Sequence, residues 1–149
     1  IKLMIKEYFF PKKSSFFLYL LAPSLMFMLI MMLWLIYPFF TNLLYFENNL
    51  LYFFCMMSLG IYGLILSGWS SNSSFAMIGS IRSIAQSISY EVVLSITIMI
   101  LLMNINSLNL YMLMNFNKFM NFLFIYMPLS MIILICMLAE INRTPFDLS

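Results

Sequence analysis

The sequence predicts an all-α, polytopic membrane helix bundle with about four transmembrane helices, and three observations support this fold class. First, 64% of the 149 residues are hydrophobic and only 8% are charged, whereas a soluble domain carries about 25% charged residues. Second, four apolar segments each approach the roughly 20 residues that cross a hydrocarbon core of about 30 Å. Third, no internal repeat and no long alternating strand pattern is present, so helices are the predicted spanning elements.

We expect one transmembrane domain over residues 1–149, as an internal fragment of a longer protein, because the sequence begins with Ile1 rather than Met. Residues 1–15 mix apolar side chains with lysines, which predicts a short interfacial helix broken by Pro11. A polar loop is expected at residues 67–83. The four spans are expected at about residues 16–40, 50–68, 84–103 and 119–141.

The basic residues predict the orientation of these spans. If residue 1 is on the inner side, four spans leave only Lys118 on the opposite side. The inner side then holds Lys2, Lys6, Lys12, Lys13, Arg82 and Arg143. This distribution follows the positive-inside rule, and an odd number of spans would have placed Arg143 on the wrong side.

Several function classes are excluded by composition. The basic residues are scattered, which argues against nucleic-acid binding. The sequence has no histidine, and Cys55 and Cys136 lie far apart within apolar runs, so no metal-binding spacing exists. No phosphate-binding loop or nucleophile motif is present, and we expect no catalytic chemistry by this chain alone. Gly60, Gly63 and Ser67 share one helix face and predict close packing in the second span.

Glu91 is the residue that most needs an explanation, because it interrupts the apolar third span. A charge at the centre of a spanning helix costs about 2.5–3.5 kcal/mol on insertion scales. Ser83, Ser87, Glu91 and Ser95 recur every four residues and therefore form one polar stripe. Such a stripe is expected to face protein or a water-filled cavity, as in a proton relay. The alternative is a structural ion pair of Glu91 with Arg82 or Arg143.

Glu140 is the second candidate acid, because it ends the fourth span on the predicted inner side. Glu91 lies about two turns into the third span from that same side. A carboxylate at a helix end can also simply reach solvent, so Glu140 taken singly is weaker evidence. Gln86 and Tyr90 form a further i, i+4 pair beside the stripe.

Two long stretches are the most specific in the sequence, GWSSNSSFAMIGSIRSIAQSISYEV at residues 68–92 and LAEINRTPFDLS at residues 138–149. They resemble the NADH-ubiquinone oxidoreductase chain 1 family, the membrane subunit at the quinone end of respiratory complex I. IKLMIKE at residues 1–7 resembles the stretch that precedes the family's second transmembrane helix. The resemblance covers the whole chain in order and implies helices two to five of an eight-helix bundle.

The resemblance also implies a function, namely a part of the ubiquinone-access channel and of the acidic proton-coupling path. It assigns Glu91, Glu140 and Tyr90 to the proton path. It places Arg82, Arg143 and Asp147 at the inner surface near the quinone cavity, and Lys2, Lys6 and Glu7 at the membrane interface. Ubiquinone is the implied substrate, shared with partner subunits, and no cofactor is bound covalently by this chain.

The implied partners are the peripheral-arm quinone-site subunits and the neighbouring membrane subunits of complex I, together with the lipid bilayer. The implied location is the mitochondrial inner membrane, with residues 1 and 149 on the matrix side. Two alternatives stay open: a transporter or channel subunit without a redox partner, and a membrane-bound hydrogenase subunit. A purely structural anchor would leave the polar stripe unexplained.

Overall fold

The computed structural model describes residues 1–2, 4–7, 10–37, 47–118 and 121–147, and every regular element within these ranges is helical. The predicted all-α class is therefore confirmed. In chain order the elements are α1 (Phe16–Leu33), the short 3₁₀ helix η1 (Trp34–Ile36), α2 (Asn49–Ser70), α3 (Ser74–Met103), α4 (Leu110–Asn117), α5 (Phe122–Ile125) and α6 (Met127–Glu140).

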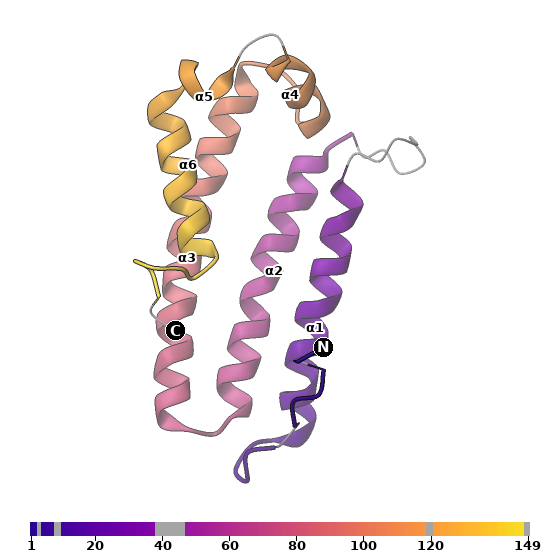
Figure 1. The fold of residues 1–149 in the computed structure, drawn as a ribbon, viewed down its shortest axis with the longest axis vertical. Helices are drawn as coiled ribbons and strands as arrows, with labels where there is room; N and C mark the ends of the chain where they lie inside the picture. Colours follow the sequence, from indigo (N-terminus) through magenta and orange to yellow (C-terminus); the bar gives the residue numbers. More distant parts are fainter. Residues whose placement is uncertain (3, 8–9, 38–46, 119–120, 148–149) are drawn as a thin grey trace.

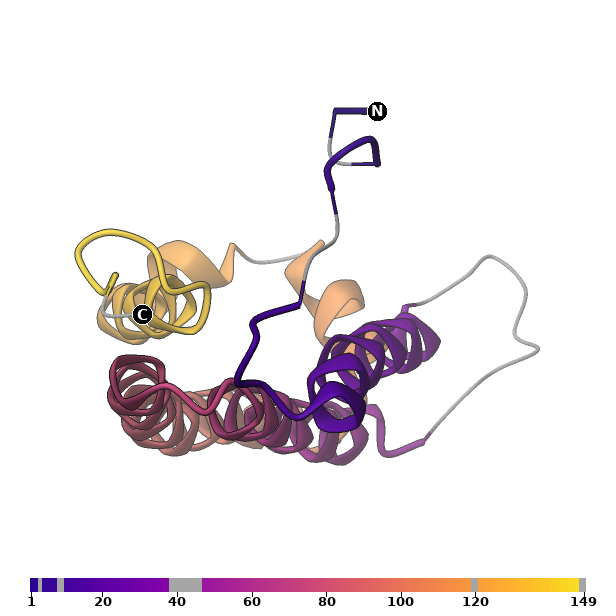
Figure 2. The ribbon, with the colours of Figure 1, turned by 90° about the horizontal axis from the view of Figure 1, so that it is seen from below.

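The long helices α1, α2 and α3 lie side by side in one row (Figure 1), and α6 packs against α3 on one face of that row (Figure 2). Among the described residues, three stretches are long and apolar enough to cross a membrane, namely Phe16–Ile36, Asn49–Ser70 and Ser74–Met103. Their outward-facing apolar side chains, such as Phe27, Ile30 and Ile96, are largely exposed. This exposure fits a bundle that is surrounded by lipid rather than by water.

The connection between the second and third predicted spans is much shorter than expected. The sequence predicts a polar loop at residues 67–83, but α2 continues to Ser70 and α3 begins at Ser74. The serines in this stretch donate their hydroxyl hydrogens to backbone carbonyls three residues earlier in the same helix, as at Ser67, Ser80 and Ser83. Because the helix itself satisfies these hydroxyls, serine-rich sequence is compatible with helix here.

The other boundaries also differ in detail from the predictions. The described residues of 1–15 form turns rather than the predicted interfacial helix, because a short segment before Pro11 gains too few hydrogen bonds to offset helix nucleation. The expected fourth span is divided into α5 and α6, with the break at Tyr126 just before Pro128. The expected end of the first span, residues 38–40, lies outside the described residues. Helix α4 is not among the predicted elements.

Hydrogen bonds between segments define the two ends of the row. At one end, the Ser15 amide donates to the Ser70 carbonyl over 3.0 Å, and Asn72 Nδ2 donates to the Lys13 carbonyl over 3.0 Å. At the opposite end, the Leu50 amide donates to the Leu108 carbonyl over 3.3 Å. The chain therefore runs from one end of the row to the other along α1, α2 and α3, while the predicted four spans and the compartment that each end faces stay predictions.

Candidate functional site

Gln86 joins α3 to the end of α6 and so defines where the candidate site lies. Its side chain is 8% exposed. Its Nε2 atom donates to the Ala139 carbonyl over 3.2 Å and to the Phe146 carbonyl over 3.1 Å. These two bonds place the C-terminal turn of α6, and the segment that follows it, against the part of α3 that carries Tyr90 and Glu91.

The two candidate acids come together at this contact. Glu91 lies on α3 and Glu140 is the last residue of α6; both side chains are half-buried. The two bonds of Gln86 hold the end of α6, where Glu140 lies, against the part of α3 that carries Glu91. Among the described residues, neither Arg82 nor Arg143 forms an ion pair with Glu91, and both arginines are exposed. The described residues therefore do not support the structural ion pair, and we call Glu91 and Glu140 the acid pair.

Tyr90 contributes an aromatic contact to the same site. Its ring meets the ring of Phe146 edge to face, with centroids 5.3 Å apart and an interplanar angle of 66°. Phe146 lies between Arg143 and Asp147, both of which are exposed. The predicted proton-path residues are therefore gathered at one place, with the predicted surface charges of the C-terminal segment next to them.

The remaining predicted residues lie apart from the contact between α3 and α6. Arg82 projects from α3 one turn before Gln86 and is exposed. Lys2, Lys6 and Glu7 are exposed in the turns that precede α1. Within the part of the chain that the structure describes, these four side chains make no hydrogen bond to the acid pair.

The residues of the serine stripe are buried or half-buried, as expected for a stripe that faces protein, and their hydroxyl hydrogens are used within α3. Ser83 is buried, Ser87 and Ser95 are half-buried, and each donates its hydroxyl to a carbonyl of its own helix over 2.8–2.9 Å. These hydroxyl hydrogens are thus used within α3 rather than directed at Glu91. The polar residue that links α3 to α6 is Gln86, and its only sequence signal is its i, i+4 spacing with Tyr90.

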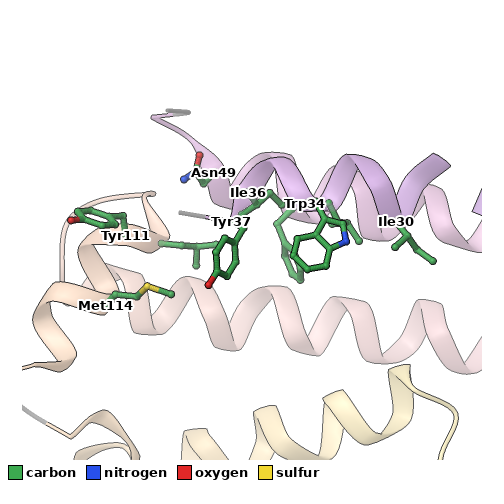
Figure 3. A pocket seen from close by; sticks show the side chains of 10 residues that line it. Ile30, Trp34, Ile36, Tyr37, Asn49, Tyr111 and Met114 are labelled. Atoms are coloured by element: carbon green, nitrogen blue, oxygen red, sulfur yellow. The ribbon is translucent and has the colours of Figure 1, made fainter. Parts of the chain in front are cut away.

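Two cavities lie away from the acids. One of about 390 Å³ is formed by the end of α1, η1, α2 and α4, and Figure 3 shows Trp34, Tyr37 and Tyr111 around it. No carboxylate is among its described lining residues, so we do not assign the acid chemistry to it. The other, about 370 Å³, lies between α1 and α2 and is lined by Tyr19, Ala22, Pro23, Met26, Gly63, Leu64 and Ser67. The part of the chain that the structure describes contains no metal-binding cluster.

Fold and site together define a class: a polytopic membrane protein in which two apolar helices bring a pair of carboxylates together. Comparison with known sequences makes this more specific. The chain matches the NADH dehydrogenase family over residues 1–149, and it belongs to that family.

Curated relatives from distant organisms support this assignment. The chain is 42% identical to NADH-ubiquinone oxidoreductase chain 1 of Locusta migratoria over 147 residues, which cover 99% of this chain and 47% of the relative. It is 42% identical to the same-named protein of Papio hamadryas over 148 residues, covering 99% and 46%. It is 38% identical to an NADH-quinone oxidoreductase subunit of the bacterium Paramagnetospirillum magneticum over 150 residues, covering 99% and 44%. The chain thus spans about half the length of these relatives.

Proposed function

We propose that this chain is part of the membrane subunit of a proton-pumping NADH:ubiquinone oxidoreductase, in which it contributes to the ubiquinone-access channel and to an acidic proton-coupling path. The observation that carries this proposal is that Gln86 on α3 bonds to the end of α6, which places Glu140 at the same helix contact as Glu91. Carboxylates within a membrane are costly and mark ion or proton pathways. The family membership supports the redox partner, because the relatives bear the names of NADH-ubiquinone and NADH-quinone oxidoreductases.

The proposed step is a proton transfer along the acid pair. In this proposal a proton passes from one carboxylate to the other through water, because both half-buried side chains lie at the contact between α3 and the end of α6. Tyr90 lies next to Glu91 in the sequence and supplies a hydroxyl on the same helix. The chain moves no electrons itself, so partner subunits must hold the redox cofactors.

Ubiquinone is the proposed substrate, shared with partner subunits. The cavity between α1 and α2 fits part of such a molecule, because it is lined mainly by apolar side chains and carries the hydroxyl-bearing residues Tyr19 and Ser67 at its wall. An apolar wall suits an isoprenoid tail, and a few hydroxyl groups suit a more polar head.

The exposed charges support the proposed partners. Arg82, Arg143 and Asp147 project from the end of the site toward the surface, where other complex I subunits of the peripheral arm and membrane arm would pair with them. The proposed location is the mitochondrial inner membrane. The excess of basic residues at one end of the row supports a matrix-side position for residues 1–15 and 143–147.

Replacing the Glu91 carboxylate tests the proposal. In the assembled enzyme, Glu91→Gln keeps the shape of the side chain but removes the acid. We expect proton pumping to fall by at least about tenfold, since positioned acid–base groups contribute roughly 10²–10⁴-fold to proton-transfer steps. Pumping is measured in sealed vesicles with NADH, alongside quinone reduction. The matched control is Glu47→Gln, which removes an exposed acid at the opposite end of the row. Unchanged pumping and quinone reduction in Glu91→Gln would remove Glu91 from the mechanism.

The second candidate function is an ion or proton transporter or channel subunit without a redox partner, because an acid pair between helices serves an ion path equally well. Purification from the native membrane separates the two functions. A large particle with NADH-dependent quinone reduction supports the oxidoreductase, whereas a free homo-oligomer without such activity supports the transporter.

A further inference from the structure

The side-chain amide of Gln86 donates hydrogen bonds to two residues that lie seven positions apart in the sequence. Both acceptors are backbone carbonyls, at Ala139 in the last turn of α6 and at Phe146 in the segment that follows. We call residues 141–147 the post-α6 segment. Glu140, one member of the acid pair, lies between the two acceptor residues in the sequence, directly after Ala139.

These bonds add a second helix to the groups that satisfy the end of α6. The last carbonyls of a helix have no partner within the helix, and a buried carbonyl without a donor is unfavourable. The Ala139 carbonyl already accepts the backbone amide of Asn142 over 3.2 Å. Gln86 adds a donor from the neighbouring helix and so ties the end of α6 to a fixed height on α3.

The amide oxygen of Gln86 indicates that the side chain contributes its hydrogen-bond donor rather than its acceptor. Gln86 Oε1 is buried and has no hydrogen-bond partner among the described residues. An apolar side chain of similar shape would occupy the same space without a buried, unpartnered acceptor. Packing alone therefore does not account for a glutamine here.

Tyr90 adds to the same contact. It follows Gln86 by one helical turn, so both side chains lie on one face of α3. The Tyr90 ring contacts the Phe146 ring, while Gln86 bonds to the Phe146 carbonyl. Phe146 therefore contacts α3 through both its backbone carbonyl and its ring, and these two contacts dock the post-α6 segment on α3.

We propose that Gln86 is a positioning residue of the acid pair, which keeps the end of α6 and the post-α6 segment docked on α3 and so keeps Glu140 beside Glu91. The docking follows from the hydrogen bonds alone, whereas its consequence for proton transfer rests on the proposed function above. Gln86 itself transfers no proton.

The test uses Gln86→Met in the intact membrane enzyme, because methionine has a similar length but cannot donate. Hydrogen–deuterium exchange is measured for peptides that cover residues 141–147. We expect exchange there to become about tenfold faster, since both hydrogen bonds that dock the segment on α3 are lost. Peptides that cover residues 104–118, at the opposite end of the row, should exchange as before. Protons pumped per quinone reduced should fall several-fold.

Two further variants sharpen this test. Gln86→His retains a side-chain N–H donor and should restore part of the protection if donation is the cause. Ser89→Ala is the matched control, because the Ser89 hydroxyl donates only to the Gln86 backbone carbonyl of its own helix, over 2.7 Å. It should change neither exchange nor pumping.

The outcomes separate the Gln86 proposal from the proposed function. Unchanged exchange in Gln86→Met would overturn the docking role, and faster exchange with unchanged pumping would overturn the positioning role. In the double variant Gln86→Met/Glu91→Gln, no further loss of pumping beyond Glu91→Gln supports action through the acid pair, whereas additive losses contradict it. If Glu91→Gln alone leaves pumping intact, the proposed function fails, and the exchange measurement still decides whether Gln86 docks the segment.

Discussion

Gly68 allows α2 and α3 to approach each other near their shared turn. A Cβ atom at this position would overlap the side chain of Ser80 on α3. At Gly63 the added atom would meet Met26 of α1, whose long side chain can move aside, whereas at Gly60 nothing lies within 4 Å. The sequence predicts close packing at the face of Gly60, Gly63 and Ser67, and Gly63 does lie at a helix contact. The glycine that leaves the least room for a side chain is Gly68, which lies outside that face.

This difference gives a prediction at the level of one residue. Gly68→Ala should lower the stability of the protein by about 1–3 kcal/mol, the usual cost of inserting atoms into a packed contact. Gly60→Ala is the matched control and should be neutral or slightly stabilising, because alanine favours helix over glycine. The thermal unfolding midpoint of the purified protein in detergent measures both. Equal midpoints for the two variants would contradict the packing that we describe.

At the scale of helices, asparagine marks three helix ends. Asn72, Asn106 and Asn142 follow α2, α3 and α6 and adopt positive φ angles of 49°, 53° and 51°. Asparagine tolerates this left-handed conformation better than other residues with a side chain, and it commonly ends helices in this way. Asn72 also donates to the Lys13 carbonyl and so ties the α2–α3 turn to the segment before α1.

Substitution of Asn72 separates the backbone effect from the hydrogen bond. Asn72→Gly and Asn72→Val both lose the bond to Lys13, but only glycine accepts a positive φ angle without strain. We expect Asn72→Val to be less stable than Asn72→Gly by about 1–2 kcal/mol, the cost of the left-handed conformation for a residue with a Cβ atom. The measurement is the difference between their unfolding midpoints. A valine variant as stable as the glycine variant would show that the turn can adopt another conformation.

The helices and the site differ in how far the sequence predicts them. Long apolar runs predict α1, α2 and most of α3, because their signal is contained in the composition of each segment. The helical state of residues 74–83 is not predicted, because serine-rich sequence is typical of loops. In the structure, the hydroxyls of Ser80 and Ser83 donate to backbone carbonyls of the helix itself. Glu91 and Glu140 are recognisable as isolated acids. The role of Gln86 is not, because its acceptors lie 53 and 60 residues away in the sequence.

At the scale of the whole molecule, the alternation of the chain between two ends predicts which sites share a compartment. We expect Ser73→Cys and Thr144→Cys to react with a membrane-impermeant maleimide from the same side, and Asn104→Cys from the opposite side. All three residues are exposed. The experiment uses sealed vesicles of both orientations, in a background where Cys55 and Cys136 are replaced by alanine. Labelling of Thr144→Cys from the same side as Asn104→Cys would mean that α5 and α6 do not cross the membrane.

The height at which α6 ends has a further consequence. The bond from Gln86 to Ala139 sets the end of α6 twelve residues after the start of α3, a rise of about 18 Å at 1.5 Å per residue. The end of α2, in contrast, lies directly beside the start of α3. The helix ends on this side of the molecule are therefore stepped rather than level. Under the proposed function, Glu140 lies about 18 Å from the level of the α2–α3 turn, so a proton that enters at that level reaches it after only part of a hydrocarbon core of about 30 Å.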